Sequence, residues 1–334
     1  MHVAFLAMSN HIRITHSSDF FIALLRDLFG EVSVIPHERA WIDLPKAHWD
    51  LVIDYQKRYS PEELEAFGAD RVVLVPMYDD CPIDEAYWNS YRAFKVLCFS
   101  STLERALSSY GLEARSARYY PEVPESAIDW SGLKGFFWPR LPSIDWGLVK
   151  KLVAGTEFER MQLHGDRVPE LDDPRIERSS WFADQAEYRA CLQRANVFFA
   201  PRPAEGIGLS FIEAMAMGHC VVAPDRPTMN EYINDGVNGL LYDPDDPRPL
   251  DFSRARELGR AARESCEAGR KAWLDGMPDI RRFLVEPARG GYAPKAHFFV
   301  SARGKLIARL RFVPGLFAFY RLLRSRIMAL KFFR

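Results

Sequence analysis

Residues 200–218, which read APRPAEGIGLSFIEAMAMG, form the stretch that decides the fold. The apolar run Val197–Ala200 predicts a buried strand, and Ser210–Met217 predicts a helix that ends at Gly218. A proline-interrupted turn with two glycines joins them, so the stretch is a strand, a tight turn and a helix start. This order is typical of an α/β fold, in which helices cover a parallel sheet.

The turn within this stretch has the chemistry of a phosphate site. Gly206 and Gly208 allow the backbone to approach a ligand closely, and the N–H groups of a helix start favour an anion. Glu205 and Glu213 flank the turn as hydrogen-bond acceptors, which suits the hydroxyl groups on either side of a nucleotide-sugar diphosphate. The alternative is that the two glutamates are spaced by chance and that the glycines only begin a helix.

The same alternation of apolar runs and helical segments extends over most of the chain and predicts two doubly wound domains. A Pro, Glu and Ser-rich break at Tyr120–Ser126 separates them. We expect an N-terminal domain over 1–125, a second domain over 126–290 and a basic tail over 291–334. In the first half the expected strands are Val3–Ala7, Val32–Ile35, Leu51–Ile53, Arg71–Val75 and Lys95–Phe99, and the expected helices Asp19–Leu28, Pro61–Ala66 and Leu103–Tyr110. In the second half the expected strands are Lys134–Trp138, Arg160–His164, Val197–Ala200, Cys220–Ala223 and Gly239–Tyr242, and the expected helices Gly147–Val153, Gln185–Arg194 and Ser210–Met217.

Composition restricts the class of protein. The 334 residues are 48% hydrophobic and carry a formal net charge of −1, which argues against a general nucleic-acid binder. Five scattered cysteines without a CxxC pair favour reduced thiols in the cytoplasm. The chain shows neither a signal-peptide pattern at its start nor an apolar run of the roughly 20 residues that span a bilayer.

The charge is distributed unevenly. Residues 295–334 contain ten Lys or Arg and no Asp or Glu. An apolar stripe at helical spacing accompanies them and consists of Leu316, Tyr320, Leu323, Ile327 and Leu330. Such a helix either lies on an anionic membrane surface or packs back on the N-terminal domain, and the two can coexist.

The whole stretch around Glu205 and Glu213 closely resembles the signature of the retaining GT-B glycosyltransferases, in particular family 4, the group 1 type. Its strand ends in proline and leads to Glu-x7-Glu and an Ala-Met-Ala-x-Gly helix end. The runs CVVAP at 220–224 and NEYINDGVNGLLYDPDD at 230–246 extend the resemblance, which spans residues 180–246. The resemblance implies two Rossmann-like domains that face each other across a cleft, with residues 1–125 as the acceptor domain and residues 126–290 as the nucleotide-sugar donor domain.

The resemblance also implies roles for individual residues. Glu205 would contact the hydroxyls of the donor sugar, and Glu213 would hold the nucleotide ribose. Arg140 occupies the place of an arginine that binds the diphosphate, for which a permanently charged planar group is well suited. The amides expected to face the diphosphate belong to Ile207, Gly208 and Leu209.

The chain departs from this family in two places. Asp145 stands where the family usually has a lysine, and Lys150 or Lys151 is a possible substitute, although both are expected on a solvated helix face. The first strand leads into a loop without glycine, and no histidine follows the fourth strand. Three residues remain as cleft candidates: Asp79, His11 and His16. For the two histidines the alternative is an ordinary surface or structural role.

We therefore expect a cytoplasmic, metal-independent, retaining glycosyltransferase without a cofactor, peripheral on the inner face of the membrane. Its partners would be a nucleotide sugar and a saccharide acceptor, expected to be lipid-linked, and it would not bind nucleic acid. The acid pairs Asp79-Asp80, Asp172-Asp173 and Asp243-Pro-Asp245 are the alternative metal ligands. A sugar-nucleotide epimerase of the same fold and a non-catalytic nucleotide-sugar or glycan-binding protein are the other functions that fit.

Overall fold

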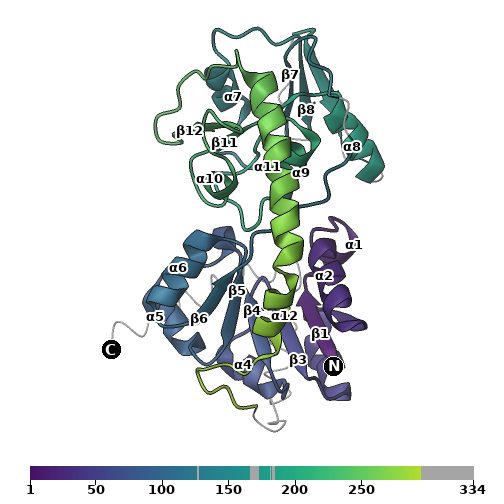
Figure 1. The fold of residues 1–334 in the computed structure, drawn as a ribbon, viewed down its shortest axis with the longest axis vertical. Coiled ribbons are helices and arrows are strands. Elements are labelled where there is room, and N and C mark those ends of the chain that lie inside the picture. Colours follow the sequence, from purple (N-terminus) through teal and green to yellow (C-terminus); the bar gives the residue numbers. More distant parts are fainter. Residues whose placement is uncertain (126–127, 166–172, 181, 183–184, 295–334) are drawn as a thin grey trace, which may run out of the picture.

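The computed structural model describes residues 1–125, 128–165, 173–180, 182 and 185–294. They form two parallel six-stranded sheets, each with its helices, one above the other in Figure 1. The predicted fold class, α/β with two doubly wound halves, is confirmed.

The first sheet has the strand order β2-β1-β3-β4-β5-β6. Its strands are β1 (Val3–Ala7), β2 (Val32–Pro36), β3 (Leu51–Tyr55), β4 (Val72–Val75), β5 (Lys95–Cys98) and β6 (Glu113–Ser116). Its helices are α1 (Ser9–Arg13), α2 (Asp19–Phe29), η1 (His37–Arg39), α3 (Ala40–Asp43), η2 (Leu44–Lys46), α4 (Pro61–Ala66), η3 (Tyr78–Asp80), α5 (Glu85–Trp88), η4 (Asn89–Tyr91) and α6 (Ser101–Ser109). The order reverses between β1 and β3, and ligands of doubly wound sheets bind outside the carboxyl ends of the strands at such a point.

The second sheet has the order β12-β11-β10-β7-β8-β9, so its reversal lies between β7 and β10. Its strands are β7 (Lys134–Phe137), β8 (Arg160–His164), β9 (Ile176–Ser179), β10 (Val197–Phe199), β11 (Cys220–Pro224) and β12 (Leu240–Tyr242). Its helices are α7 (Trp146–Leu152), α8 (Gln185–Gln193), α9 (Leu209–Met217) and α10 (Met229–Tyr232). Every residue of the inner strands β7, β10 and β11 is buried. This agrees with the apolar runs of β10 and β11, whereas β7 begins with Lys134, which pairs with Asp129.

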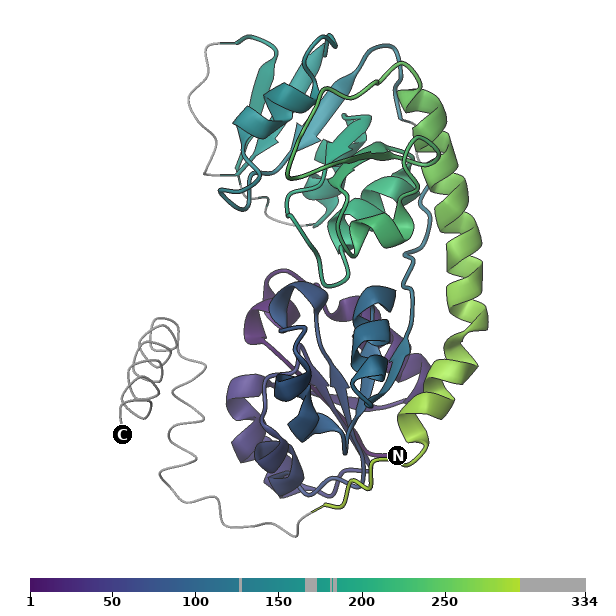
Figure 2. The same cartoon turned by 90° about the vertical axis from the view of Figure 1, so that its left-hand side faces the viewer.

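Two helices at the end of the described chain connect the halves. The 21-residue α11 (Ala255–Asp275) packs on α9 and β11 and then runs alongside both halves, as Figure 2 shows. The following α12 (Met277–Val285) buries Ile280, Phe283 and Leu284, and the Arg281 side chain donates to the carbonyl of Leu28, 3.2 Å away. The chain therefore returns from the second sheet to pack on the first.

A carboxylate of the second half caps a helix of the first half. Glu231 in α10 accepts hydrogen bonds from the Ser100 hydroxyl (2.8 Å) and from the amides of Ser101 (2.7 Å) and Thr102 (3.0 Å) at the start of α6. An anion at a helix N-terminus is favoured by the free amides and by the helix dipole. Glu231 thus fixes one contact between the two halves.

We predict that Glu231→Gln destabilises the protein by about 1–2 kcal/mol at pH 7, because the amide keeps the shape but loses the charge. Burial raises the pKa of Glu231, but the hydrogen bonds from Ser101, Thr102 and Ser100 outweigh it and leave the pKa below its ordinary 4.5. A depressed carboxyl pKa gives stability that is present above the unfolded value and is lost as the pH falls through the folded value. Urea unfolding of both proteins from pH 7 down to about pH 2.5 measures this, and a stability gap that stays constant over this range would contradict it.

The basic tail over 295–334 lies outside the described residues, so its placement stays a prediction. Among the residues that the structure does describe, no helix has both the length and the apolar character needed to cross a membrane.

Candidate functional site

The candidate site begins at the reversal point of the second sheet. Arg140 follows β7 and the glycine turn follows β10, so the two flank the crevice between these strands. Gly208, at φ 82°, is the N-cap of α9 and offers no side chain to the amides of the first turn. The segment between β11 and α10 fixes the turn by two hydrogen bonds. The Thr228 hydroxyl donates to the Ile207 carbonyl (3.3 Å), and the Glu205 amide donates to the carbonyl of Pro227 (3.3 Å). The predicted strand, glycine turn and helix start are therefore present, and anion binding at this turn stays a prediction.

Glu205 lies at the centre of the charged groups that converge here. Glu205 is 9% exposed, and burial raises the pKa of its carboxyl from 4.5 to about 7. The charges of Arg202 and Arg140 act against this shift, whereas that of Asp79 adds to it. The structure therefore brings together Glu205, Arg140 and Asp79, three residues that the sequence places in the candidate site. A buried carboxyl with a pKa near neutrality beside other charged groups is typical of a functional site.

The Arg140 guanidinium lies over the ring of Trp138, 4.4 Å from its centre. Burial and the like charge of Arg202 lower the pKa of Arg140. A stacked, partly buried guanidinium has a fixed orientation, which suits recognition of phosphate oxygens.

Other predicted donor-site residues lie in α9 and α7. Glu213 is half-buried in α9, and burial raises its pKa, with Arg189 acting in the opposite direction. Asp145 caps α7 and accepts from the Leu148 amide at 2.8 Å, which is a structural use of this acid. Lys150 is exposed in the last turn of α7, and among the described residues no hydrogen bond or ion pair joins it to Glu205, Arg140 or the glycine turn. Its donor role stays a prediction.

The first half contributes residues that directly follow β1 and β3. His11 in α1 is half-buried, its Nδ1 pairs with the Ser17 hydroxyl, and its Nε2 lies 3.3 Å from Gln56 Nε2. Burial lowers the pKa of His11, and the charges of Arg58, Arg202 and Arg140 lower it further. His11 therefore lies within reach of the charges of Arg202 and Arg140, which follow β10 and β7. His16, in contrast, is exposed and pairs with Asp19 at 3.0 Å.

The loop after β3 was not identified as a site from the sequence. Gln56 (φ 66°) and Lys57 (φ 43°) are consecutive non-glycine residues in the left-handed region, a backbone arrangement that costs about 1–2 kcal/mol per residue. The fully buried Asp54 compensates by accepting from the amides of Arg58 (3.1 and 2.9 Å) and Tyr59 (3.2 Å). The sequence gives no signal of this strained backbone, because neither position is a glycine. The one available signal is that the loop follows a predicted strand, and ligands of such sheets bind at the carboxyl ends of strands.

The acid pairs proposed as alternative metal ligands are engaged in other contacts. Asp79 pairs with Arg202 (2.9 Å) and Asp80 with Arg58 (2.5 Å). Asp243 accepts from the Asp245 amide (2.9 Å), as expected for a turn. Asp172 lies outside the described residues, and Asp173 pairs with Arg175 at 2.8 Å.

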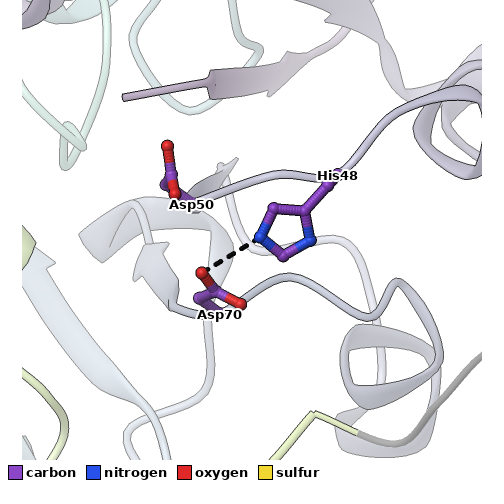
Figure 3. Close-up of side chains that lie close together, drawn as sticks. All are labelled: His48, Asp50 and Asp70. Carbon is purple, nitrogen blue, oxygen red and sulfur yellow. Dashed lines mark hydrogen bonds and ion pairs between the residues drawn. The ribbon is translucent and has the colours of Figure 1, made fainter.

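One group of side chains among the described residues is close enough to share a metal ion (Figure 3). It consists of His48, Asp50 and Asp70, with His48 Nε2 3.1 Å from Asp70 Oδ2. These residues precede β3 and β4, so they lie at the amino ends of the strands. Asp79 follows β4 and lies at the carboxyl end. An ion held there would not reach a ligand in the cradle.

Comparisons with known proteins find a sequence match in the second half of the chain. Residues 143–255 match the family described as Glycosyl transferases group 1. A stretch of 93 residues is 38% identical to the alpha-maltose-1-phosphate synthase of Mycolicibacterium smegmatis and covers 23% of this chain and 24% of that protein. For the protein of the same name from Mycobacterium tuberculosis the identity is 32% over 104 residues, covering 26% and 27%. The chain thus spans about a quarter of the length of the curated relatives that it matches.

Solved structures resemble the whole described fold. Sucrose-phosphate synthase from Thermosynechococcus elongatus has a TM-score of 0.62 at 16% identity, over 84% of this chain and 98% of that one. Anabaena HepE, solved in complex with UDP and glucose, has a TM-score of 0.54 at 14% identity, over 98% of this chain and 100% of that one. The chain therefore has the predicted GT-B-type fold.

Proposed function

We propose that the chain is a glycosyltransferase that moves a sugar from a nucleotide diphosphate donor to an acceptor hydroxyl with retention, without a metal ion. The observation that carries the proposal is the convergence of Glu205, Arg140 and the open start of α9 at the reversal point of the second sheet. The match of residues 143–255 to Glycosyl transferases group 1 covers the glycine turn and supports the assignment.

In the proposed reaction the donor lies in the second half of the molecule. Arg140 and the amides of Ile207, Gly208 and Leu209 would receive the charge that develops on the leaving diphosphate, Glu205 would hold the sugar hydroxyls and Glu213 the ribose. The acceptor would approach from the first half, past Asp79 and His11. HepE, which binds UDP and glucose, supports this type of donor.

The acceptor proposed here is a lipid-linked saccharide in cell-surface glycan synthesis. Its support is the sequence of residues 295–334, with ten basic and no acidic side chains. The synthases of maltose-1-phosphate and sucrose phosphate among the relatives make a free sugar phosphate the competing acceptor class.

The experiment that tests the function is a screen of nucleotide sugars by thermal shift, followed by transfer assays with lipid-linked and phosphorylated acceptors in EDTA. A donor at about 100 times its dissociation constant stabilises by roughly 2.7 kcal/mol, which is readily detected. We expect transfer to survive EDTA, because the basic and backbone groups around Glu205 can take the place of a metal. Loss of transfer on chelation, restored by manganese or magnesium, would refute the metal-independent mechanism, and interconversion of free nucleotide sugars without acceptor would indicate an epimerase.

The lipid-linked acceptor predicts salt-sensitive binding to anionic vesicles. Each Lys or Arg near an anionic leaflet contributes about 1 kcal/mol within a Debye length, so several together suffice for reversible attachment. Deletion of Leu316–Arg334 is expected to release the protein from phosphatidylserine vesicles in co-sedimentation while leaving donor binding unchanged. Indifference of the full chain to such vesicles at low salt would remove the support for a membrane-bound acceptor.

A further inference from the structure

One ion pair joins the donor turn to the first sheet. Arg202 follows β10, and its Nη1 donates to Asp79 Oδ2 at 2.9 Å, across 123 residues of sequence. The two side chains are 33% and 19% exposed, so the pair is shielded on most sides. It lies at the turn that leads directly to Glu205.

Arg202 has hydrogen-bonding capacity that this pair does not use. Its Nε is buried, and no acceptor for it exists among the described residues. A buried donor without a partner is unfavourable, so the arrangement favours a ligand that supplies acceptors. Arg202 is also close enough to Arg140 for the two positive charges to oppose each other, which a bound dianion would relieve.

Asp79 covers the cradle that an anionic ligand would enter. A Cβ placed on Gly206 would lie 2.9 Å from Asp79 Oδ1 and 2.7 Å from Met77 Cβ, and residues 205–208 are all buried. A charged Asp79 and a diphosphate would repel each other in this space. The diphosphate and the Asp79 carboxylate therefore compete for the same guanidinium.

We propose that Arg202 is a second ligand of the donor diphosphate beside Arg140, and that Asp79 holds Arg202 in the donor-free protein until the diphosphate displaces it. This role rests on the proposed function, because it requires a nucleotide diphosphate in the cradle. Exchange of one carboxylate for a doubly charged group also leaves Asp79 free to face the sugar and the incoming acceptor. Donor binding thereby prepares the acceptor side of the cleft.

The test is the affinity of UDP, GDP and ADP, and of their sugars, for the wild type and for variants of both partners, measured by calorimetry. Asp79→Asn is expected to tighten binding by up to about tenfold, because a competitor of the diphosphate is removed. Arg202→Gln is expected to weaken it by about 10- to 100-fold, the range for charge-assisted hydrogen bonds, and Arg202→Lys by less. In the Arg202→Gln background, Asp79→Asn should bring no gain.

Asp80 provides the matched control, since it lies on the same loop but pairs with Arg58. Asp80→Asn also removes one negative charge and should change affinity by less than about twofold. Equal tightening by both Asn variants, or tightening that persists without Arg202, would reduce the effect to general electrostatics and overturn the proposal. Weaker binding by both Asp79→Asn and Arg202→Gln would mean that the ion pair only stabilises the structure of the site, which would overturn the proposal. Thermal unfolding of each variant checks that interpretation. If the wild type binds no nucleoside diphosphate, the proposed function itself fails.

Discussion

Replacing Glu205 with glutamine is expected to slow sugar transfer and, at the same time, to stabilise the donor-free protein at pH 8. Burial raises the pKa of this carboxyl from 4.5 to about 7. An acid with a raised folded pKa costs no stability below its unfolded pKa, and the cost grows as the pH rises and is complete above the folded pKa. Glutamine removes a cost of up to about 3 kcal/mol, so the gain should be present at pH 8 and small at pH 5.

The expected loss of activity has a different origin. The Glu205 carboxylate is proposed to accept hydrogen bonds from the donor sugar, and such charge-assisted bonds contribute about 1.5–3 kcal/mol, or about 10- to 150-fold in kcat/KM. Urea unfolding at both pH values and transfer kinetics measure the two effects. Glu264→Gln is the control for the chemical change, because Glu264 is exposed on α11 in a pair with Arg260. Unchanged kinetics together with lower stability at pH 8 would make Glu205 a structural residue.

Buried strands could be predicted from sequence because their physics is local. The expected strands Val3–Ala7 and Arg160–His164 coincide with β1 and β8, and the helix Pro61–Ala66 with α4. Inner strands of a parallel sheet are apolar on both faces, and this leaves a continuous hydrophobic run. The edge strands β6 and β9 were not predicted, because their half-exposed residues Glu113–Ser116 and Ile176–Ser179 are mostly polar.

The candidate site could be predicted where a local motif or the family resemblance marks its residues. Glu205 and the glycine turn share one strand-turn-helix unit, and Arg140 follows a strand at the same reversal point. Arg202 depends on Asp79 from the other half, and the left-handed backbone at Gln56 depends on the buried Asp54, so neither has a local signature. The long helix α11 was not predicted either, although its buried residues Ala255, Leu258, Ala262 and Cys266 recur at helical spacing.

Alanine substitutions at Gly208 and Gly206 are expected to have different effects. The first should affect folding, and the second the contact between the two halves. A Cβ on Gly208 would lie 1.9 Å from Phe211 Cε1 within the core of the second half, at a left-handed φ of 82°. Strain and overpacking together predict a loss of about 2–5 kcal/mol for Gly208→Ala. Thermal unfolding should show this loss directly.

Gly206→Ala is expected to act on the contact between the halves. The added Cβ would lie 2.7 Å from Met77 Cβ, and both Met77 and Asp79 belong to the first half. The Gly206 backbone does not need a left-handed φ, so the second half can fold around alanine while the loop of the first half must move away. Because near-attack geometry tolerates little displacement, we expect kcat/KM to fall by about 100-fold with a change in the unfolding free energy below about 1 kcal/mol. A Gly206→Ala protein as unstable as Gly208→Ala would assign the glycine to folding, and wild-type kinetics would mean that transfer does not need this contact between Gly206 and the β4 loop.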